Sequence, residues 1–151
     1  SFHSQTFFLA RKFRLHLDIE AHPARCVLDR TIYEDAEIFA AHLAQSGHLS
    51  ERDHRTYLEL YSAMRRSLAP PDLLIHLRCS VRAIRKRIQR RNRAAEQGIS
   101  ASYLRQLNRL YDDWIRGWSD SPLVVWDSEG LDYLEDLVDQ IEFHRALEPF
   151  L

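Results

Sequence analysis

The sequence is poor in cysteine, with only Cys26 and Cys79 among its 151 residues. Two cysteines at strand-like positions make no disulfide framework and favour a reducing compartment, so we expect a cytoplasmic protein. No apolar run reaches the length of a membrane span and no signal peptide is visible, so we expect no membrane partner. Repeats, low-complexity tracts and long linkers are also missing, which predicts a single domain over residues 1–151.

An overall excess of positive charge is missing as well. The formal net charge is -1, although eight basic residues and no acid lie between Arg78 and Arg93. A domain that binds nucleic acid normally carries a basic balance, so we expect no nucleic-acid partner. A local basic cluster in a nearly neutral protein fits a compact polyphosphate better than a long polyanion.

This basic segment reads as a helix followed by a polar loop. Apolar residues at helical spacing predict the helix, and Arg87 and Arg91 share one of its faces, with Arg93 at the edge of the loop. Such a helix is either a solvated surface or a phosphate-gripping lid at about residues 87–98. Crowded guanidinium groups repel one another unless an anion lies among them, and their forked donors suit phosphate.

The remaining pattern alternates helices with short apolar strands. Helices are expected over residues 2–22, 34–45, 50–68, 81–93, from Ser100 onward, and 131–147, with Ser50 and Ser100 as N-caps; strands are expected over 26–28, 73–77 and 123–126. Strands separated by long helices predict an α/β fold, with a parallel sheet covered by helices on both faces.

Ligands gather at the carboxyl ends of the strands in such sheets. Asp29 and Arg30 follow the first expected strand, and the basic helix follows the second. One interpretation of this pair is structural, as an ion pair or a turn. The other is functional: Asp29 holds Mg²⁺ or its water shell, and Arg30 neutralises charge on a transferred phosphoryl group. Glu34 and Glu37 suit a helix N-terminus and need no further role.

With these residues in view, the sequence resembles the deoxynucleoside kinases, most closely the bacterial branch that acts on deoxyadenosine and deoxyguanosine. The resemblance rests on residues 2–9 (FHSQTFFL), 29–39 (DRTIYEDAEIF), 103–104 (YL), 112–114 (DDW) and the arginine lid, which occur in family order. It implies a P-loop kinase-like fold.

On the nucleoside side, the resemblance implies that Gln5 contacts the base edge and that Asp35 contacts the base together with a basic residue, Lys12. Lys12 stands where relatives more often have arginine, so the bidentate part of base recognition has no counterpart here. Phe39 corresponds to a wall of the base pocket. Glu96 corresponds to the carboxylate that accepts a hydrogen bond from the sugar 3′-hydroxyl.

On the donor side, the resemblance implies that Asp29 and Arg30 lie beside the 5′-hydroxyl and Mg²⁺, with ATP as phosphate donor. The residues implied to contact ATP are Arg87, Arg91, Arg93, Asp127 and Glu129, and among them Arg91 and Arg93 act on the transferred phosphate. It also implies a homodimer formed through the helices of residues 34–45 and 50–68.

One departure from the family pattern stands out. The loop G-x-x-x-x-G-K-[ST] is missing from the sequence, whose only lysines are Lys12 and Lys86. The chain also does not begin with Met. We therefore expect it to be the back part of a longer enzyme and to be inactive alone.

The expected activity is ATP- and Mg²⁺-dependent phosphorylation of the 5′-hydroxyl of purine deoxyribonucleosides in nucleotide salvage. Two alternatives remain open. A nucleoside monophosphate kinase would share the fold, the lid and the donor. A non-catalytic nucleotide-binding or dimerising module would bind without turnover.

Overall fold

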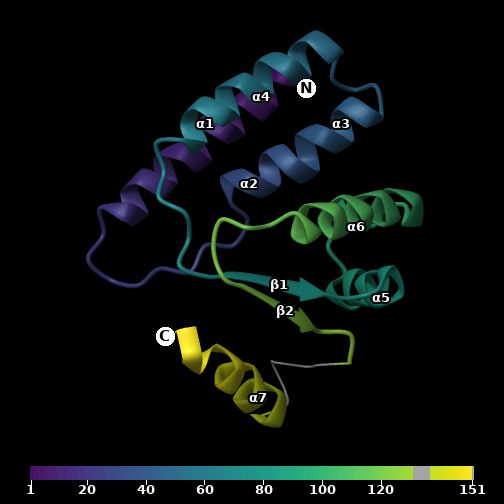
Figure 1. Cartoon of the computed structure of the whole chain (residues 1–151). Coiled ribbons are helices and arrows are strands. Elements are labelled where there is room, and N and C mark those ends of the chain that lie inside the picture. The colour runs from purple at the N-terminus through teal and green to yellow at the C-terminus, as the bar shows by residue number, and fades with distance from the viewer. Residues whose placement is uncertain (131–136, 151) are drawn as a thin grey trace. The chain divides into compact units, whose positions relative to one another are not determined.

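A computed structural model describes residues 1–130 and 137–150 of the chain. The architecture is α/β, as predicted, with helices before, between and after two parallel strands in the described part (Figure 1). The elements are α1 (Phe2–Glu20), α2 (Ile32–Glu34), the π-helix η1 (Asp35–Ala40), α3 (Ala41–Gln45), α4 (Glu51–Arg65), β1 (Leu74–Arg78), α5 (Val81–Arg91), the 3₁₀ turn η2 (Ala94–Glu96), α6 (Ala101–Arg116), β2 (Leu123–Asp127), α7 (Leu137–Leu147) and the 3₁₀ turn η3 (Glu148–Phe150).

The chain forms two compact units. The first contains residues 1–69 and 105–117, and the second contains residues 70–104 and the chain from Trp118 onward.

The first unit is a packed set of helices. In it α1, α4 and the continuous stretch from α2 through η1 to α3 contact one another (Figure 1). Its core consists of side chains that the solvent does not reach, namely Leu9 of α1, Ile32 and Ile38 of the α2–η1 stretch, and Tyr57 of α4. The predicted cap of α4 is confirmed, because Ser50 Oγ accepts a hydrogen bond of 3.1 Å from the Asp53 N–H. The unit therefore packs η1 against both of its long helices, α1 and α4.

The second unit contains the sheet. β1 and β2 are parallel neighbours, with Leu74 opposite Leu123 and Leu77 opposite Trp126. On α7, Phe143 packs edge-on against Trp126, with 5.6 Å between ring centroids. The predicted cap at Ser100 is confirmed by a 3.1 Å hydrogen bond from the Tyr103 N–H. β1 leads into α5 and β2 into the segment after Asp127, so both follow the carboxyl ends of paired strands.

The strand predicted over residues 26–28 is wrong. This segment is irregular, Cys26 is exposed and the Val27 side chain is 98 % exposed. A strand needs a neighbour for its N–H and C=O groups, and among residues 1–130 and 137–150 no segment pairs with this one. Asp29 and Arg30 therefore follow an extended segment instead of a buried strand.

The helix predicted over residues 131–147 is confirmed from Leu137 to Leu147, and its first six residues lie outside the described part. Across the described ranges, no helix combines the length and the apolar character that crossing a membrane requires.

Candidate functional site

A sharp backbone turn at Arg30 opens the site in the first unit. Arg30 has a φ of 61°, in the left-handed region that few residues other than glycine adopt. Thr31 follows as the N-cap of α2 in extended conformation, and its N–H donates a 2.7 Å hydrogen bond to Glu34 Oε2. This Thr–Glu capping box ends the turn and leaves Asp29 and Arg30 exposed to solvent.

Two contacts hold the rest of Arg30. The Lys12 ammonium on α1 donates a hydrogen bond to the Arg30 carbonyl oxygen. The Arg30 guanidinium lies over the ring of Phe39, 5.4 Å from its centroid, which is cation–π geometry. The fold therefore brings Lys12, Arg30 and Phe39 together from three different segments.

Asp35 is the buried acid of this cluster. It is 9 % exposed, and its Oδ2 atom is buried without a hydrogen-bond partner among the described residues. Burial raises the pKa of its carboxyl, although the nearby cations Lys12 and Arg30 act in the opposite direction. A buried acceptor without a donor is unfavourable in the free protein, and it is available for a donor on a ligand.

The π-helix places Asp35 and Phe39 on one side. Within η1 the chain makes hydrogen bonds five residues apart, as from the Ala41 N–H to the Ala36 carbonyl. A π turn is wider than an α turn, so residues four apart lie almost one above the other. Gln5 is half-buried on α1 and lies seven residues before Lys12, hence on the same side of that helix.

In the second unit, the arginine lid contains its own anion. Arg91 ends α5, and its Nη2 atom lies 2.8 Å from Glu96 Oε2, while Arg93 Nη1 lies 3.7 Å from Glu96 Oε1. The helix ends at Asn92, whose φ of 50° turns the chain back so that Glu96 reaches the arginines. Charge repulsion among the arginines predicts an anion between them. In this structure the chain itself supplies that anion, the Glu96 carboxylate.

Arg87 and Glu129 hold the loop after β2. The Arg87 guanidinium donates hydrogen bonds to the carbonyl and the hydroxyl of Ser128, which is buried. The Glu129 carboxylate accepts from the Ser80 N–H at 2.6 Å and from Ser80 Oγ at 2.7 Å, and these bonds lower the pKa of Glu129. Ser80 also caps α5, so this loop is anchored to the start of the basic helix.

Asp127 ends β2 and pairs with Arg78 at the end of β1, with 3.2 Å between Oδ2 and Nη2. The Glu129 N–H donates to Asp127 Oδ1 at 3.0 Å, and this bond is the main reason why the pKa of Asp127 is lowered. The residues predicted to contact ATP thus form two groups in one unit: Arg91 and Arg93 with Glu96, and Arg87 with the loop of residues 127–129.

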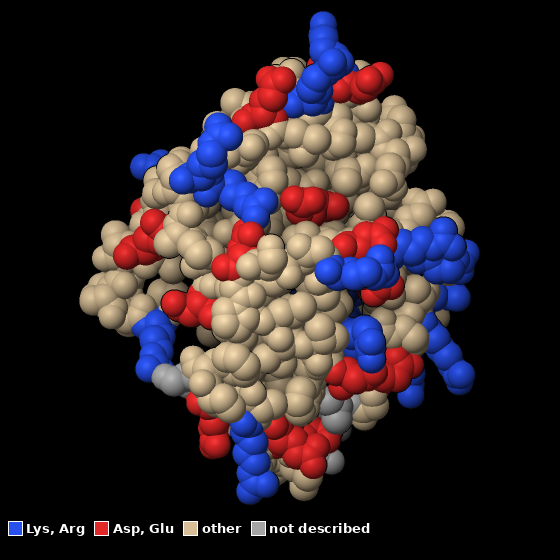
Figure 2. All heavy atoms as spheres, in the orientation of Figure 1, with Lys and Arg blue, Asp and Glu red and all other residues tan. Residues whose placement is uncertain are grey.

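Figure 2 shows basic side chains gathered where Figure 1 draws α5, with acidic side chains beside them. The interspersed acids agree with a local anion site better than with an extended basic surface.

The described residues contain no group of three side chains able to enclose a metal ion. Mg²⁺ keeps several waters and needs only one or two carboxylates beside substrate phosphates. The exposed carboxylate of Asp29, next to Arg30, fits that mode of binding.

Sequence reasoning missed a role for Glu34. Besides capping Thr31, Glu34 Oε1 accepts a 3.0 Å hydrogen bond from the Tyr111 hydroxyl on α6. The Thr-x-x-Glu spacing was a visible signal for the cap. Nothing local pointed to Tyr111, which is 77 residues further along the chain.

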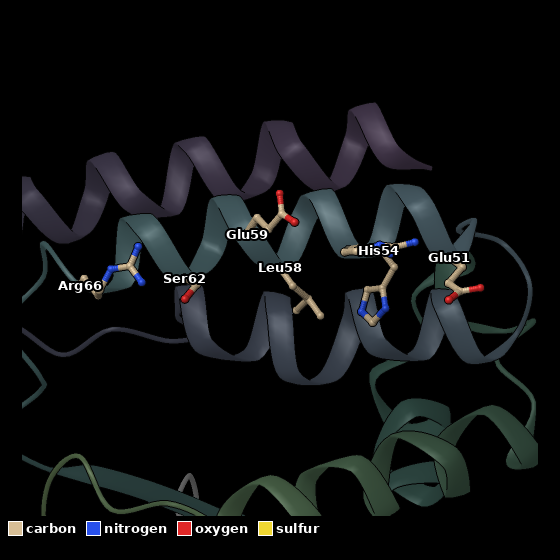
Figure 3. A pocket seen from close by; sticks show the side chains of 7 residues that line it. Glu51, His54, Leu58, Glu59, Ser62 and Arg66 are labelled. Atoms are coloured by element: carbon tan, nitrogen blue, oxygen red, sulfur yellow. The ribbon is translucent and has the colours of Figure 1, made fainter.

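A hollow lies on the surface of α4, and none of the predicted site residues lines it. Figure 3 shows Glu51, His54, Leu58, Glu59 and Ser62 of α4, with Arg66 at its C-cap, along one side of the helix.

Comparisons with known proteins agree with this arrangement. Among curated proteins, the chain is 37% identical to the deoxyadenosine/deoxycytidine kinase of Bacillus subtilis, over 93% of this chain and 69% of that protein. It is 36% identical to the deoxyadenosine kinase of Dictyostelium discoideum, over 76% of this chain and 46% of that protein. It is 33% identical to the deoxyguanosine kinase of Lactobacillus johnsonii, over 91% and 65% of the two chains. The chain therefore spans between about half and about two thirds of the length of these relatives.

A solved structure of deoxyadenosine kinase from M. mycoides with bound dATP superposes with a TM-score of 0.77 at 25% identity. The match covers 96% of this chain and 72% of that protein, and it confirms the predicted kinase-like α/β fold. The family comparison matches residues 1–150 to the deoxynucleoside kinases. This chain belongs to the deoxynucleoside kinase family.

Proposed function

We propose that the protein containing this chain transfers the γ-phosphoryl group of ATP to the 5′-hydroxyl of purine deoxyribonucleosides, in nucleotide salvage. The observation that carries the proposal is the cluster of Lys12, Arg30, Asp35 and Phe39, in which a buried carboxylate oxygen lacks a partner among the described residues. The names of its relatives, which include kinases of deoxyadenosine, deoxyguanosine and deoxycytidine, support the reaction class.

Base recognition would use the first unit. Asp35 Oδ2 would accept a hydrogen bond from the base, Gln5 would contact the base edge, and the Phe39 ring would pack against the base. Lys12 keeps positive charge near Asp35 and so favours its ionised form, against the effect of burial. An acceptor of this kind selects bases that present an N–H donor, and the resemblance of Asp35 to an acid of purine-accepting relatives supports the preference for purines.

Phosphoryl transfer would rely on positioning and charge neutralisation. Arg30 would stabilise charge that develops on the transferred group. Mg²⁺, held through its water shell by Asp29, would neutralise charge on the donor phosphates. Arg91 and Arg93 would bind those phosphates when the lid closes, and closure would exclude water as a competing acceptor.

Glu96 would accept a hydrogen bond from the sugar 3′-hydroxyl, in exchange for its contacts with the arginines. Asp127 and Glu129, with Arg87 behind them, would hold the loop that faces the base of ATP. The bonds of Glu129 to Ser80 support a fixed conformation for this loop before ATP arrives.

The test is ATP-dependent phosphorylation of the four deoxynucleosides by the full-length protein that contains this chain. Loss of a hydrogen bond to a charged group predicts that Asp35→Ala raises KM for deoxyguanosine or deoxyadenosine by about tenfold to a hundredfold. Asp18→Ala, which removes an exposed acid of α1, is the control and should match the wild type. Turnover of deoxycytidine alone would overturn the purine preference.

The same assay includes dAMP and dGMP, because a nucleoside monophosphate kinase would share the fold and the lid. Phosphorylation of the monophosphates but not of the nucleosides would replace the proposed reaction with that one. Binding of deoxynucleosides without turnover of any substrate would indicate a non-catalytic module.

We also propose a homodimer formed through the helices around α3 and α4. Leu58 and Leu60 on α4 are exposed, which supports an apolar contact there, and the hollow along the same helix adds charged and polar side chains around Leu58. Sedimentation of the full-length protein should give a dimer, and Leu58→Glu should shift it toward monomer. A wild-type monomer would exclude this proposal.

We propose a cytoplasmic location because the sequence has only two cysteines and no disulfide framework, which favours a reducing compartment. Cell fractionation followed by immunoblotting tests it, and recovery of the protein outside the cytoplasmic fraction would contradict it.

A further inference from the structure

Arg30 adopts a backbone conformation that needs support from outside. A left-handed φ is unfavourable at a residue other than glycine and persists only where surrounding contacts enforce it. The contacts on its N-terminal neighbour are few, since Asp29 is exposed and residues 25–28 have no regular structure. Support must therefore come largely from the residues that follow and from Lys12.

Thr31 provides the link to that support. Its N–H, directly after the Arg30 carbonyl, donates to Glu34 Oε2 at 2.7 Å, and its hydroxyl lies 3.4 Å from the same oxygen. The Arg30 carbonyl itself accepts from the Lys12 ammonium. Both sides of the peptide bond between Arg30 and Thr31 are thus fixed.

Glu34 is in turn fixed by Tyr111. Its second oxygen, Oε1, accepts the 3.0 Å hydrogen bond from the Tyr111 hydroxyl, so neither carboxylate oxygen is left to solvent alone. Tyr111 is mostly buried and its ring lies 6.1 Å from that of Trp114 on the same helix. Burial, together with the Glu34 carboxylate, raises the pKa of Tyr111 above its ordinary value, so its hydroxyl remains a donor at neutral pH.

Helix-dipole matching does not explain this arrangement. A dipole acts on any acid in the first turn and requires no partner from a helix 77 residues away. Tyr61 offers a contrast within the same unit, because its hydroxyl donates at 3.4 Å to Glu37, whereas Glu34 is the acid that caps Thr31. Both pairs join a tyrosine hydroxyl to a glutamate, but the Tyr61 bond is longer and does not involve Glu34.

We propose that Glu34 and Tyr111 are positioning residues that hold the turn at Arg30, so that the Arg30 guanidinium is aimed for phosphoryl transfer. This inference rests on the proposed kinase function. The pair acts through Arg30 and touches no substrate. Its removal therefore lowers the rate of phosphoryl transfer more than it weakens binding of the nucleoside or of ATP.

The first experiment compares Tyr111→Phe with Tyr61→Phe in the full-length protein. Loss of a hydrogen bond to the Glu34 carboxylate, a charged acceptor, predicts that Tyr111→Phe lowers kcat by about tenfold to a hundredfold. Both KM values should stay within about twofold of the wild type, because an interaction used only in the transition state changes kcat alone. Tyr61→Phe, which also removes a hydrogen bond between a tyrosine and a glutamate, should leave kcat unchanged.

Glu34 variants give a second, independent measure. Glu34→Gln keeps an oxygen for the Thr31 N–H and an amide for Tyr111, so it should retain more of kcat than Glu34→Ala. A higher kcat for Glu34→Gln than for Glu34→Ala, with equal KM values for the two variants, supports a positioning role. Equal kcat for the two variants would overturn it, and these variants also serve if Tyr111→Phe does not fold.

A third readout does not require turnover. Amide hydrogen exchange over residues 29–35, followed by mass spectrometry, should be faster in Tyr111→Phe than in the wild type and unchanged in Tyr61→Phe. Unchanged exchange in Tyr111→Phe, or a kcat equal to that of Tyr61→Phe, overturns the inference. If the wild type phosphorylates no deoxynucleoside, the proposed function fails, and the exchange measurement alone decides whether the pair holds the turn.

Discussion

Arg91 Nη2 lies 2.8 Å from Glu96 Oε2, so the chain places a carboxylate among the arginines that we propose bind ATP phosphates. The pair is partly exposed, with 49% of the Arg91 side chain and 20% of the Glu96 side chain accessible. Solvent screens such a pair, and its contribution is small enough for a phosphate to displace it. Glu96 therefore holds the arginines in order without preventing their use.

Glu96→Gln should separate the two roles of this residue. Release of Arg91 predicts a KM for ATP lower by about twofold to fivefold, the range of an exposed ion pair. KM for the deoxynucleoside should rise, because the amide oxygen is a weaker acceptor for the 3′-hydroxyl. Steady-state kinetics with a 3′-deoxy analogue checks the second part: the analogue should be a poorer substrate for the wild type but not for the variant. An unchanged KM for ATP would argue against the release of Arg91.

Asp35→Asn should stabilise the fold while it impairs the reaction. Burial raises the pKa of the Asp35 carboxyl in the folded state above its unfolded value, so the folded protein binds the proton more tightly. The free energy of unfolding therefore falls as pH rises from the unfolded pKa to the folded pKa, and above the folded pKa the loss is constant. The variant should gain a few degrees in Tm at neutral pH, and the gain should shrink as pH falls toward the ordinary pKa of aspartate.

Thermal denaturation of the wild type and Asp35→Asn between acidic and neutral pH measures this difference. Asp18→Asn is the control, since that acid is exposed on α1 and its removal should give no pH-dependent change. A gain in Tm that does not vary with pH would mean that the titration of Asp35 is not its source.

Ser80→Ala tests the anchor of the loop after β2. Ser80 caps α5 and donates to Glu129, and loss of a cap costs about 1 kcal/mol. In a protein of this size that free energy lowers Tm by about 2–4 °C. Freeing the loop should also raise KM for ATP by about threefold to tenfold, the value of one hydrogen bond.

Ser50→Ala makes the matched comparison. Ser50 caps α4 with a bond of the same kind, so it should lower Tm by a similar amount. Ser50 does not hold the loop of residues 127–129, so KM for ATP should not change. Equal effects of the two variants on KM for ATP would show that loop anchoring does not depend on Ser80.

Local chemistry explains which features the sequence predicted correctly. The caps at Ser50 and Ser100 and the long helices follow from residues within one or two turns of each other. The predicted strand over residues 26–28 failed because a short apolar run does not reveal whether a neighbouring strand exists. Similarly, arginine repulsion pointed to an anion between Arg91 and Arg93. Asn92 is a residue that favours a left-handed helix end, but the sequence does not show that the turn brings Glu96 to the arginines.

The site shows the same division. The resemblance placed Asp35 at the base, and the structure buries its carboxyl beside Lys12 and Arg30. The bond between Glu34 and Tyr111 was missed, since it joins residues 77 apart and depends on how α6 packs. The sequence accordingly predicts the residue types at the site more completely than it predicts what holds them in place.

The π-helix makes the length of the chain part of the site. A π turn corresponds to one residue inserted into an α-helix, so deleting one residue after Phe39 would let η1 relax to α-helical geometry. The narrower turn would shift the backbone from which Asp35 and Phe39 project, although every side chain of the cluster would still be encoded. The length of this segment is therefore part of the site, which a comparison of residue identities alone would overlook.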